Sequence, residues 1–255
     1  MSQLPTRPSR KGQPSHRIMF YSHDTFGLGH LRRSRALATA LTQGDETASA
    51  IILTGSPVAG RFTFPERVDH IRLPGVTKLA DGSYVSQTLG LDIDEITSLR
   101  SGLIKTAIEK YEPDLLIVDK EPSGFRGELL PSLEWLRDHG TTKTVLGLRD
   151  VLDEPKVLAA EWARKNAIQA TEEFYDEIWV YGDRDIYDPT KGLNLSDETR
   201  DRMHWTGYLR RETTDEVDLP EHPYVLITPG GGGDGAAMVS LVLEAYEKDP
   251  DLAPN

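Results

Sequence analysis

Short runs of apolar, often β-branched residues alternate along this chain with longer stretches in which apolar residues recur every three or four positions. The short runs predict strands at 17–21, 50–54, 70–73, 114–119, 143–148 and 177–181. The longer stretches predict helices at 30–43, 94–110, 127–139 and 155–171. Because most of these strands are apolar throughout, we expect both faces of their sheet to be buried. Helical crossovers between such strands predict a doubly wound parallel α/β domain.

The composition changes along the chain in a way that predicts its domain organisation. We expect a disordered basic tail at 1–16, an α/β domain at 17–207 and an acidic linker at 208–222. A further strand at 224–228, a glycine loop and a helix at about 234–247 then predict the first βα unit of a second Rossmann-like domain at 223–255. A single βα unit cannot cover its own strand on both faces. We therefore expect either a fragment of a longer two-domain protein, or a unit that joins the first sheet.

Composition and charge exclude several classes of protein. The 255 residues carry 29 Lys and Arg against 41 Asp and Glu, which gives a net charge of −12. This balance argues against nucleic acid and anionic membranes as partners, because both require a positive face. No apolar run approaches the roughly 18 residues of a transmembrane helix. The absence of cysteine excludes disulfides and thiolate sites and is compatible with the cytoplasmic location that we expect.

The first candidate site is the turn that joins the first strand to the first helix. Gly27 and Gly29 would let the backbone turn tightly, and the helix that follows offers free N–H groups to an anion. His30 opens that helix and would lean towards the strand ends, where an imidazole can act as a base or hold an anion. The alternative is an ordinary helix-terminal histidine satisfied by the backbone. Arg33 flanks the same face and is near enough to reach an anion.

The second candidate is a glycine-rich loop between the strand at 224–228 and the last helix. Its successive glycines would let several backbone N–H groups converge on one phosphate, and Asp234 would cap the helix. The loop also fits the G-x-G-x-x-G pattern of nicotinamide-dependent dehydrogenases, which requires a further acidic strand. It lacks the Lys-Ser/Thr pair of a P-loop. We expect phosphate contacts from Gly231, Gly232, Gly233, Asp234 and Gly235.

Polar side chains also follow the middle strands of the predicted sheet. Asp119 ends one strand, and Arg149 and Asp150 end the next, so all three are expected beside His30. Ion pairs or helix caps are the alternative roles. Two D-x-D segments, at 92–94 and 183–185, resemble divalent-metal motifs, but two acids alone are weak support and capping is commoner. We predict no bound metal.

Several segments together resemble predicted bacterial glycosyltransferases similar to the MurG-type, two-domain GT-B enzymes. The resemblance rests on FYSHDTFGLGHLRRSRALA at 20–38, VDKEPSG at 118–124, LGLRD at 146–150, WTGY at 205–208 and TPGGGGDG at 228–235, which occur in the family's order. It implies an amino-terminal domain that binds a saccharide or lipid-linked acceptor and a carboxyl-terminal domain that binds a nucleotide-diphosphate sugar.

The resemblance also implies roles for particular residues. His30 matches the turn histidine of the family, as base or acceptor ligand, and His23, Gly27 and Gly29 would lie on the acceptor side. The loop at 231–235 would meet the diphosphate, so no metal or other cofactor is expected. Much of the donor domain is missing by comparison with the family, which would leave the chain inactive. A non-catalytic phosphate-binding module and a sugar-nucleotide epimerase of the same fold are the alternatives.

Overall fold

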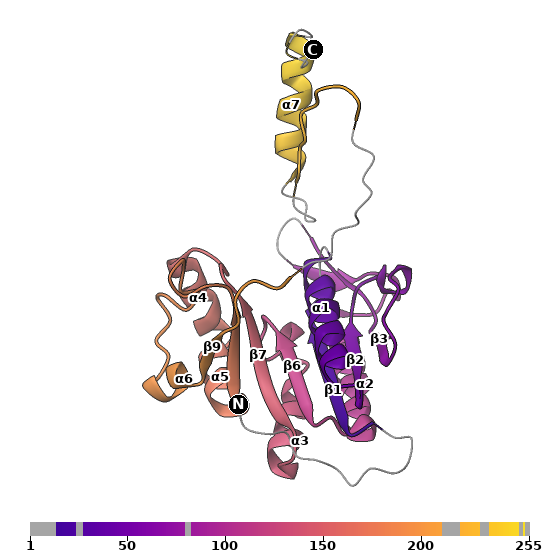
Figure 1. Ribbon diagram of the computed structural model, residues 1–255, viewed down its shortest axis with the longest axis vertical. Helices are drawn as coiled ribbons and strands as arrows, with labels where there is room; N and C mark the ends of the chain where they lie inside the picture. The colour runs from indigo at the N-terminus through magenta and orange to yellow at the C-terminus, as the bar shows by residue number, and fades with distance from the viewer. Residues whose placement is uncertain are drawn as a thin grey trace.

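The protein is built on one parallel sheet, seen in the computed structural model of residues 14–23, 28–79, 83–210, 220–229, 235–249 and 252. Seven strands run in the order β3-β2-β1-β6-β7-β8-β9, and each is parallel to its neighbours (Figure 1). They are β1 (His16–Ser22), β2 (Ala48–Thr54), β3 (Val68–Arg72), β6 (Leu115–Asp119), β7 (Lys143–Arg149), β8 (Glu177–Tyr181) and β9 (Met203–Trp205). The predicted doubly wound α/β class is confirmed.

The strand order reverses at β1. The chain leaves β1 through α1 (Gly29–Gly44) to β2 on one side, and it returns much later to place β6 on the other side. Such a reversal is the point at which ligands bind in open α/β sheets, outside the carboxyl ends of the strands. We call this edge of the sheet the carboxyl edge.

Helices cover the two faces of the sheet unequally. One buried cluster joins alternate residues of β1, β6, β7 and β8 to α2 (Ile93–Tyr111), α3 (Leu130–His139), α4 (Pro155–Arg164) and α5 (Ala167–Phe174). A second cluster joins the intervening residues to α1. Strands that are apolar at every position are therefore explained by burial on both faces. Within the described ranges, no helix combines the length and apolarity that a bilayer crossing requires.

The α1 helix follows its predicted bounds but turns its buried side by one residue from the expected arc. Leu31, Ser34 and Ala38 are buried, whereas Leu37 and Leu41 are only partly covered. Periodicity alone did not fix this rotation. The 16-residue helix has no side-chain cap and no acidic residue in its first turn.

The helix predicted at 155–171 is two helices, and that prediction was wrong in its continuity. Asn166 stands between α4 and α5 with φ +50°, in the left-handed region that asparagine tolerates better than most residues. Several short elements were not predicted. They are η1 (Ala59–Arg61), the antiparallel pair β4 (Val76–Lys78) and β5 (Tyr84–Ser86), η2 (Phe125–Gly127), α6 (Asp197–Asp201) and β9.

The carboxyl-terminal segment forms only half of the predicted βα unit. The helix is present as α7 (Ala236–Lys248), which buries none of its residues (Figure 1). Residues 224–228 are described but form no strand, so that prediction was wrong. A strand needs a neighbour for its backbone N–H and C=O groups, and none of the described strands pairs with this segment.

Candidate active site

His30 and Asp119 meet at the carboxyl edge, where β1 and β6 lie side by side. His30 lies in the first turn of α1, directly after the β1 turn, and Asp119 is the last residue of β6. The Nδ1 atom of His30 is 2.7 Å from Oδ2 of Asp119. Asp119 is buried, and the His30 side chain is 20% exposed. The structure thus places two sequence-predicted site residues in direct contact, with Nε2 as the second nitrogen of the exposed ring.

Arg33 is the third member of this group. Its Nη1 atom donates to Oδ1 of Asp119 at 2.6 Å and to Oδ2 at 2.9 Å. Burial opposes ionisation of Asp119, but the hydrogen bond from His30 and the charge of Arg33 outweigh burial and hold the pKa of Asp119 below its usual range. The carboxylate is therefore ionised at neutral pH. The sequence predicts that Arg33 reaches an anion. In the structure, that anion is the carboxylate of Asp119.

His23 completes the group on the β1 side. Its ring lies edge-on to the ring of His30, with centroids 6.0 Å apart. Burial lowers the pKa of His23 well below its usual value, and the neighbouring charges of His30 and Lys120 act in the same direction. The Nδ1 atom of His23 is buried and has no hydrogen-bond partner among the described residues. His23 therefore presents a neutral imidazole beside His30.

The loop that follows β6 brings opposite charges to the same edge. Lys120 adopts φ +71°, and the next residue, Glu121, is buried. Nζ of Lys165, from the α4–α5 junction, donates to Glu121 at 2.8 Å and to Glu161 at 2.6 Å. Burial of Lys165 is outweighed by these carboxylates, which raise its pKa. The loop is thereby tied to α4 beside His23.

Other predicted site residues do not join this group. Arg149 ends β7 and Asp150 follows it at the carboxyl edge, but Arg149 is exposed and, within the described part of the chain, its guanidinium donates to the Leu152 carbonyl alone, at 3.4 Å. Asp150 accepts from the backbone of Val151 at 3.0 Å. Among the described residues, neither has a hydrogen bond to His30 or Asp119. Asp150 also accepts a hydrogen bond from the Tyr208 hydroxyl and caps no described helix, since Glu154 caps α4.

The glycines of the two candidate loops are described only in part. Gly29 opens α1, and among the described residues no atom outside its own turn lies within 4 Å of where a Cβ would stand. A Cβ on Gly235 would lie 2.2 Å from Cβ of Pro229, which explains a glycine there by close packing. Gly27, Gly231, Gly232, Gly233 and Asp234 lie outside the described residues. Their expected phosphate contacts stay predictions.

The acidic D-x-D segments have structural roles. Asp92 caps α2 by accepting from the backbone of Asp94 at 2.8 Å, and Glu95 completes the capping box. Asp183 accepts from the backbone of Asp185 at 2.9 Å. In the part of the chain that the structure describes, no group of three or more His, Asp or Glu side chains is placed to hold a metal.

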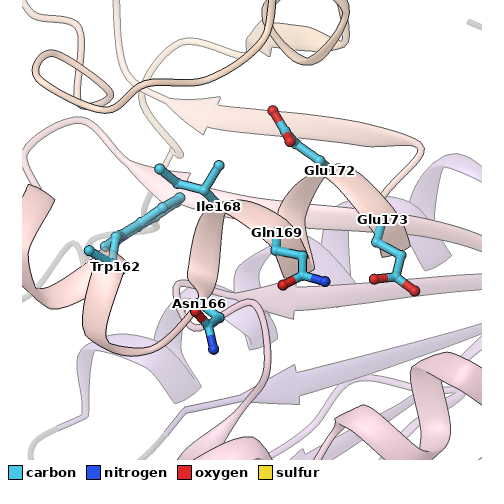
Figure 2. A pocket seen from close by; sticks show the side chains of 7 residues that line it. Trp162, Asn166, Ile168, Gln169, Glu172 and Glu173 are labelled. Carbon is cyan, nitrogen blue, oxygen red and sulfur yellow. The ribbon is translucent and has the colours of Figure 1, made fainter.

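A cavity of about 500 Å³ lies at the junction of α4 and α5 (Figure 2). Its side chains come from Trp162, Ala163, Asn166, Ile168, Gln169, Glu172 and Glu173. Its two carboxylates are already engaged, since Glu172 accepts from the backbone of Ser196 at 3.0 Å and Glu173 pairs with Arg137. The lining of this cavity includes none of the sequence-predicted site residues.

Sequence reasoning placed Arg33 at the flank of the His30 face but missed that Arg33 shares Asp119 with His30. The available signal was the spacing, since Arg33 stands three positions after His30 and so lies on the same side of the helix. Tyr181 was also missed. Its ring lies 5.7 Å from the Arg33 guanidinium, and nothing in the local sequence connects the two residues.

Comparison with solved structures agrees with this architecture. A glycosyltransferase from Rickettsia africae matches with a TM-score of 0.50 and 14% identity, over 75% of this chain and 42% of that one. A UGT transferase from Siraitia grosvenorii in complex with UDP matches with a TM-score of 0.44 and 13% identity, over 67% and 46%. A putative UDP-N-acetylglucosamine 2-epimerase from Listeria monocytogenes gives 0.46 and 13%, over 73% and 43%.

The chain spans less than half the length of these three structures. No protein-family model matches the sequence, and no curated protein matches it either. What the comparison shows is the fold: the chain has the Rossmann-like α/β architecture found in the glycosyltransferase from Rickettsia africae.

Proposed function

We propose that this protein takes part in the transfer of a sugar from a nucleotide-diphosphate sugar to an acceptor hydroxyl, with His30 as the general base. The observation that carries the proposal is the contact between His30 and the buried Asp119 at the carboxyl edge. An ionised carboxylate accepts a hydrogen bond, so it favours the imidazole form that carries its proton on Nδ1. Nε2 then has the lone pair that can take a proton from an acceptor.

The proposed reaction follows from that arrangement. Nε2 of His30 accepts the proton of the acceptor hydroxyl as its oxygen bonds to the anomeric carbon of the donor. The bond from that carbon to the diphosphate oxygen breaks, and the electron pair leaves with the nucleoside diphosphate. Asp119 stabilises the imidazolium that forms, and a positioned base of this kind typically contributes about 10²- to 10⁴-fold in rate. The donor and acceptor would be held at adjacent positions on the carboxyl edge.

The remaining residues have roles in the same proposal. His23 and Gly29 would line the acceptor side, beside the uncapped start of α1. Arg149 and Asp150 would reach only a larger acceptor, because they lie apart from the histidine pair. Residues 231–235 would meet the diphosphate and replace a metal ion, so no cofactor is proposed. The acceptor is a saccharide or a lipid-linked saccharide, and the location is cytoplasmic.

The test is release of nucleoside diphosphate by the purified full-length protein. Common nucleotide-sugars are supplied with saccharide and lipid-linked acceptors, and product is measured by a coupled assay. His30→Ala is expected to lower turnover by about 10²-fold or more, and Asp119→Asn by at least about 10-fold. Arg32→Ala, an exposed change in the same helix, serves as the control.

Three outcomes would overturn the assignment. Conversion of the donor without an acceptor would identify a sugar-nucleotide epimerase. Loss of acceptor affinity alone in His30→Ala, with unchanged turnover, would make His30 a ligand of the acceptor. No release with any donor, together with no thermal stabilisation by any donor, would refute sugar transfer.

A further inference from the structure

Arg33 is an internal ion-pair partner, although its neighbour on the same helix, Arg32, is exposed. Its side chain is 16% exposed, while Asp119 beneath it is 5% exposed. The exposed Arg32 precedes it, and Arg35 lies 5.9 Å above the ring of Phe62. A charge that is mostly withdrawn from water is stable only where its partner is well placed. The position of Arg33 is therefore coupled to the position of Asp119.

Tyr181 and Gly147 form the space in which Arg33 lies. Gly147 pairs with Asp119 across the β6–β7 ladder, and Tyr181 ends the next strand, β8. The Arg33 guanidinium is 5.7 Å from the centre of the Tyr181 ring. A Cβ on Gly147 would lie 2.2 Å from the Tyr181 hydroxyl and 2.8 Å from its ring. A glycine at 147 is thus required for the ring to lie over β7 and reach Arg33.

The Tyr181 hydroxyl itself does not explain why this ring is buried. It has no hydrogen-bond partner among the described residues, although Asp119 is near enough to raise its pKa in addition to the effect of burial. The contact that Tyr181 supplies is therefore the face of its ring. An aromatic face beneath a guanidinium holds the cation by electrostatic attraction. Tyr181 supports Arg33 from the side opposite α1.

Arg33 and His30 share one oxygen of the carboxylate. His30 Nδ1 lies 2.7 Å from Oδ2, and Arg33 Nη1 lies 2.9 Å from the same atom and 2.6 Å from Oδ1. With His30 alone, the Asp119 carboxylate could rotate about its Cβ–Cγ bond and present either oxygen to His30. With Arg33 bridging both oxygens, its plane is fixed. The direction of the His30 ring is fixed in consequence.

We propose that Arg33 is a positioning residue: supported by Tyr181 over Gly147, it orients the Asp119 carboxylate and so holds His30 in the Nδ1–H form. This inference rests on the proposed function of His30. It assigns to Arg33 no contact with a substrate. Its action passes through Asp119, whereas the sequence alone pointed to an external anion as the partner of Arg33.

The test reads the imidazole of His30 directly, without donor or acceptor. Long-range ¹H–¹⁵N spectra of the full chain report which ring nitrogen carries the proton, and His30→Gln identifies the signals. In the wild type, we expect one dominant form with the proton on Nδ1. In Arg33→Met, we expect that dominance to be lost in favour of a mixture with the Nε2–H form. Arg32→Met makes the same change of charge on the same helix and should leave the spectrum unchanged.

A second variant keeps every charge and tests the support of Arg33. In Gly147→Ala, the added Cβ displaces Tyr181, and we expect a shift towards the same mixture. Arg33→Lys is expected to recover the wild-type form only in part, because an ammonium lacks the flat guanidinium that lies over the Tyr181 ring. An unchanged His30 spectrum in folded Arg33→Met overturns the inference. If Arg33→Met does not fold, an unchanged spectrum in Gly147→Ala overturns it.

This experiment separates the inference from the proposed function. A protein that transfers no sugar still reports the form of His30, so the spectra can support Arg33 while the activity assay refutes transfer. Where transfer is measured, Arg33→Met should lower kcat by about 10- to 100-fold with the donor KM unchanged, as expected for a misplaced base. A change confined to the donor KM would instead make Arg33 a ligand of the donor.

Discussion

Glu128→Gln should destabilise the protein more than any other single polar change in its core. Both guanidinium edges of Arg100 are used: Nε donates to Glu128 at 2.6 Å, Nη2 donates to Glu128 at 2.6 Å and Nη1 donates to the Pro74 carbonyl at 2.6 Å. Tyr21 also donates to Glu128, at 2.7 Å. The Arg100 and Glu128 side chains are 3% and 0% exposed. Removing one partner of such a pair leaves the other charge buried and unpaired.

The expected loss is about 3 to 5 kcal/mol, the usual effect of breaking a buried pair. Since domains are stable by roughly 5 to 15 kcal/mol, this is a large part of the total. Urea unfolding followed by tryptophan fluorescence measures it. Asp94→Asn is the matched control, because the pair of Asp94 with Arg126 has the same 2.6 Å length but side chains that are 79% and 47% exposed.

The control should lose less than about 1 kcal/mol, since water screens an exposed pair. The double variant Arg100→Met with Glu128→Leu should recover at least half of the loss, because no charge is then left buried. A loss below about 1 kcal/mol in Glu128→Gln would refute the reasoning. It would mean that the pair is hydrated in solution and that burial does not set its contribution.

Three further changes test other parts of the structure by urea unfolding. Tyr181→Phe should be neutral or stabilising by up to about 1 kcal/mol, because it removes a buried hydroxyl without a partner; a loss above about 1 kcal/mol would contradict this. Gly124→Ala should destabilise by at least about 2 kcal/mol, because Gly124 has φ +71° and its Cβ would lie 2.8 Å from Leu129; equal stability would show that the loop relaxes. Hydrogen bonds from Thr47 lower the pKa of Asp45 to about 2, so the stability that Asp45→Asn removes should be fully present above about pH 4 and vanish as the pH falls through about 2. Because the Asp45 side chain is 36% exposed, this loss of stability should not exceed about 1 kcal/mol. A stability difference between wild type and Asp45→Asn that grows on acidification would contradict the assignment.

Much of the fold could be predicted because its strands are apolar on both faces. Leu115 to Val118 are all buried, and such runs bounded by helices leave few alternatives to a parallel sheet. The break at Asn166 could not be predicted, because a left-handed asparagine leaves no periodic signal. The strand at 224–228 was predicted from its composition, although a strand forms only where a neighbour pairs with it. The local sequence pattern predicts whether a residue is buried better than it predicts whether a neighbouring strand is there to pair with it.

The candidate site was predictable where it depends on topology. His30 and Asp119 were placed at one edge because parallel strands end together, and their contact follows from the pairing of β1 with β6. The role of Arg33 depends on Gly147 and Tyr181, which lie on two other strands. The sequence records no link among these three, because the contact exists only after the sheet has assembled.

The pairing of β1 with β6 also determines which parts of the sequence can vary without moving His30 away from Asp119. His30 and Asp119 are 89 positions apart in the chain, but their strands are neighbours at a spacing of about 4.8 Å. Within the intervening segment, the small β4–β5 hairpin stands outside the seven-stranded sheet, so its length and sequence can change without moving the two side chains apart. Such a scaffold is free to diversify what it accepts while the histidine–carboxylate distance is inherited unchanged.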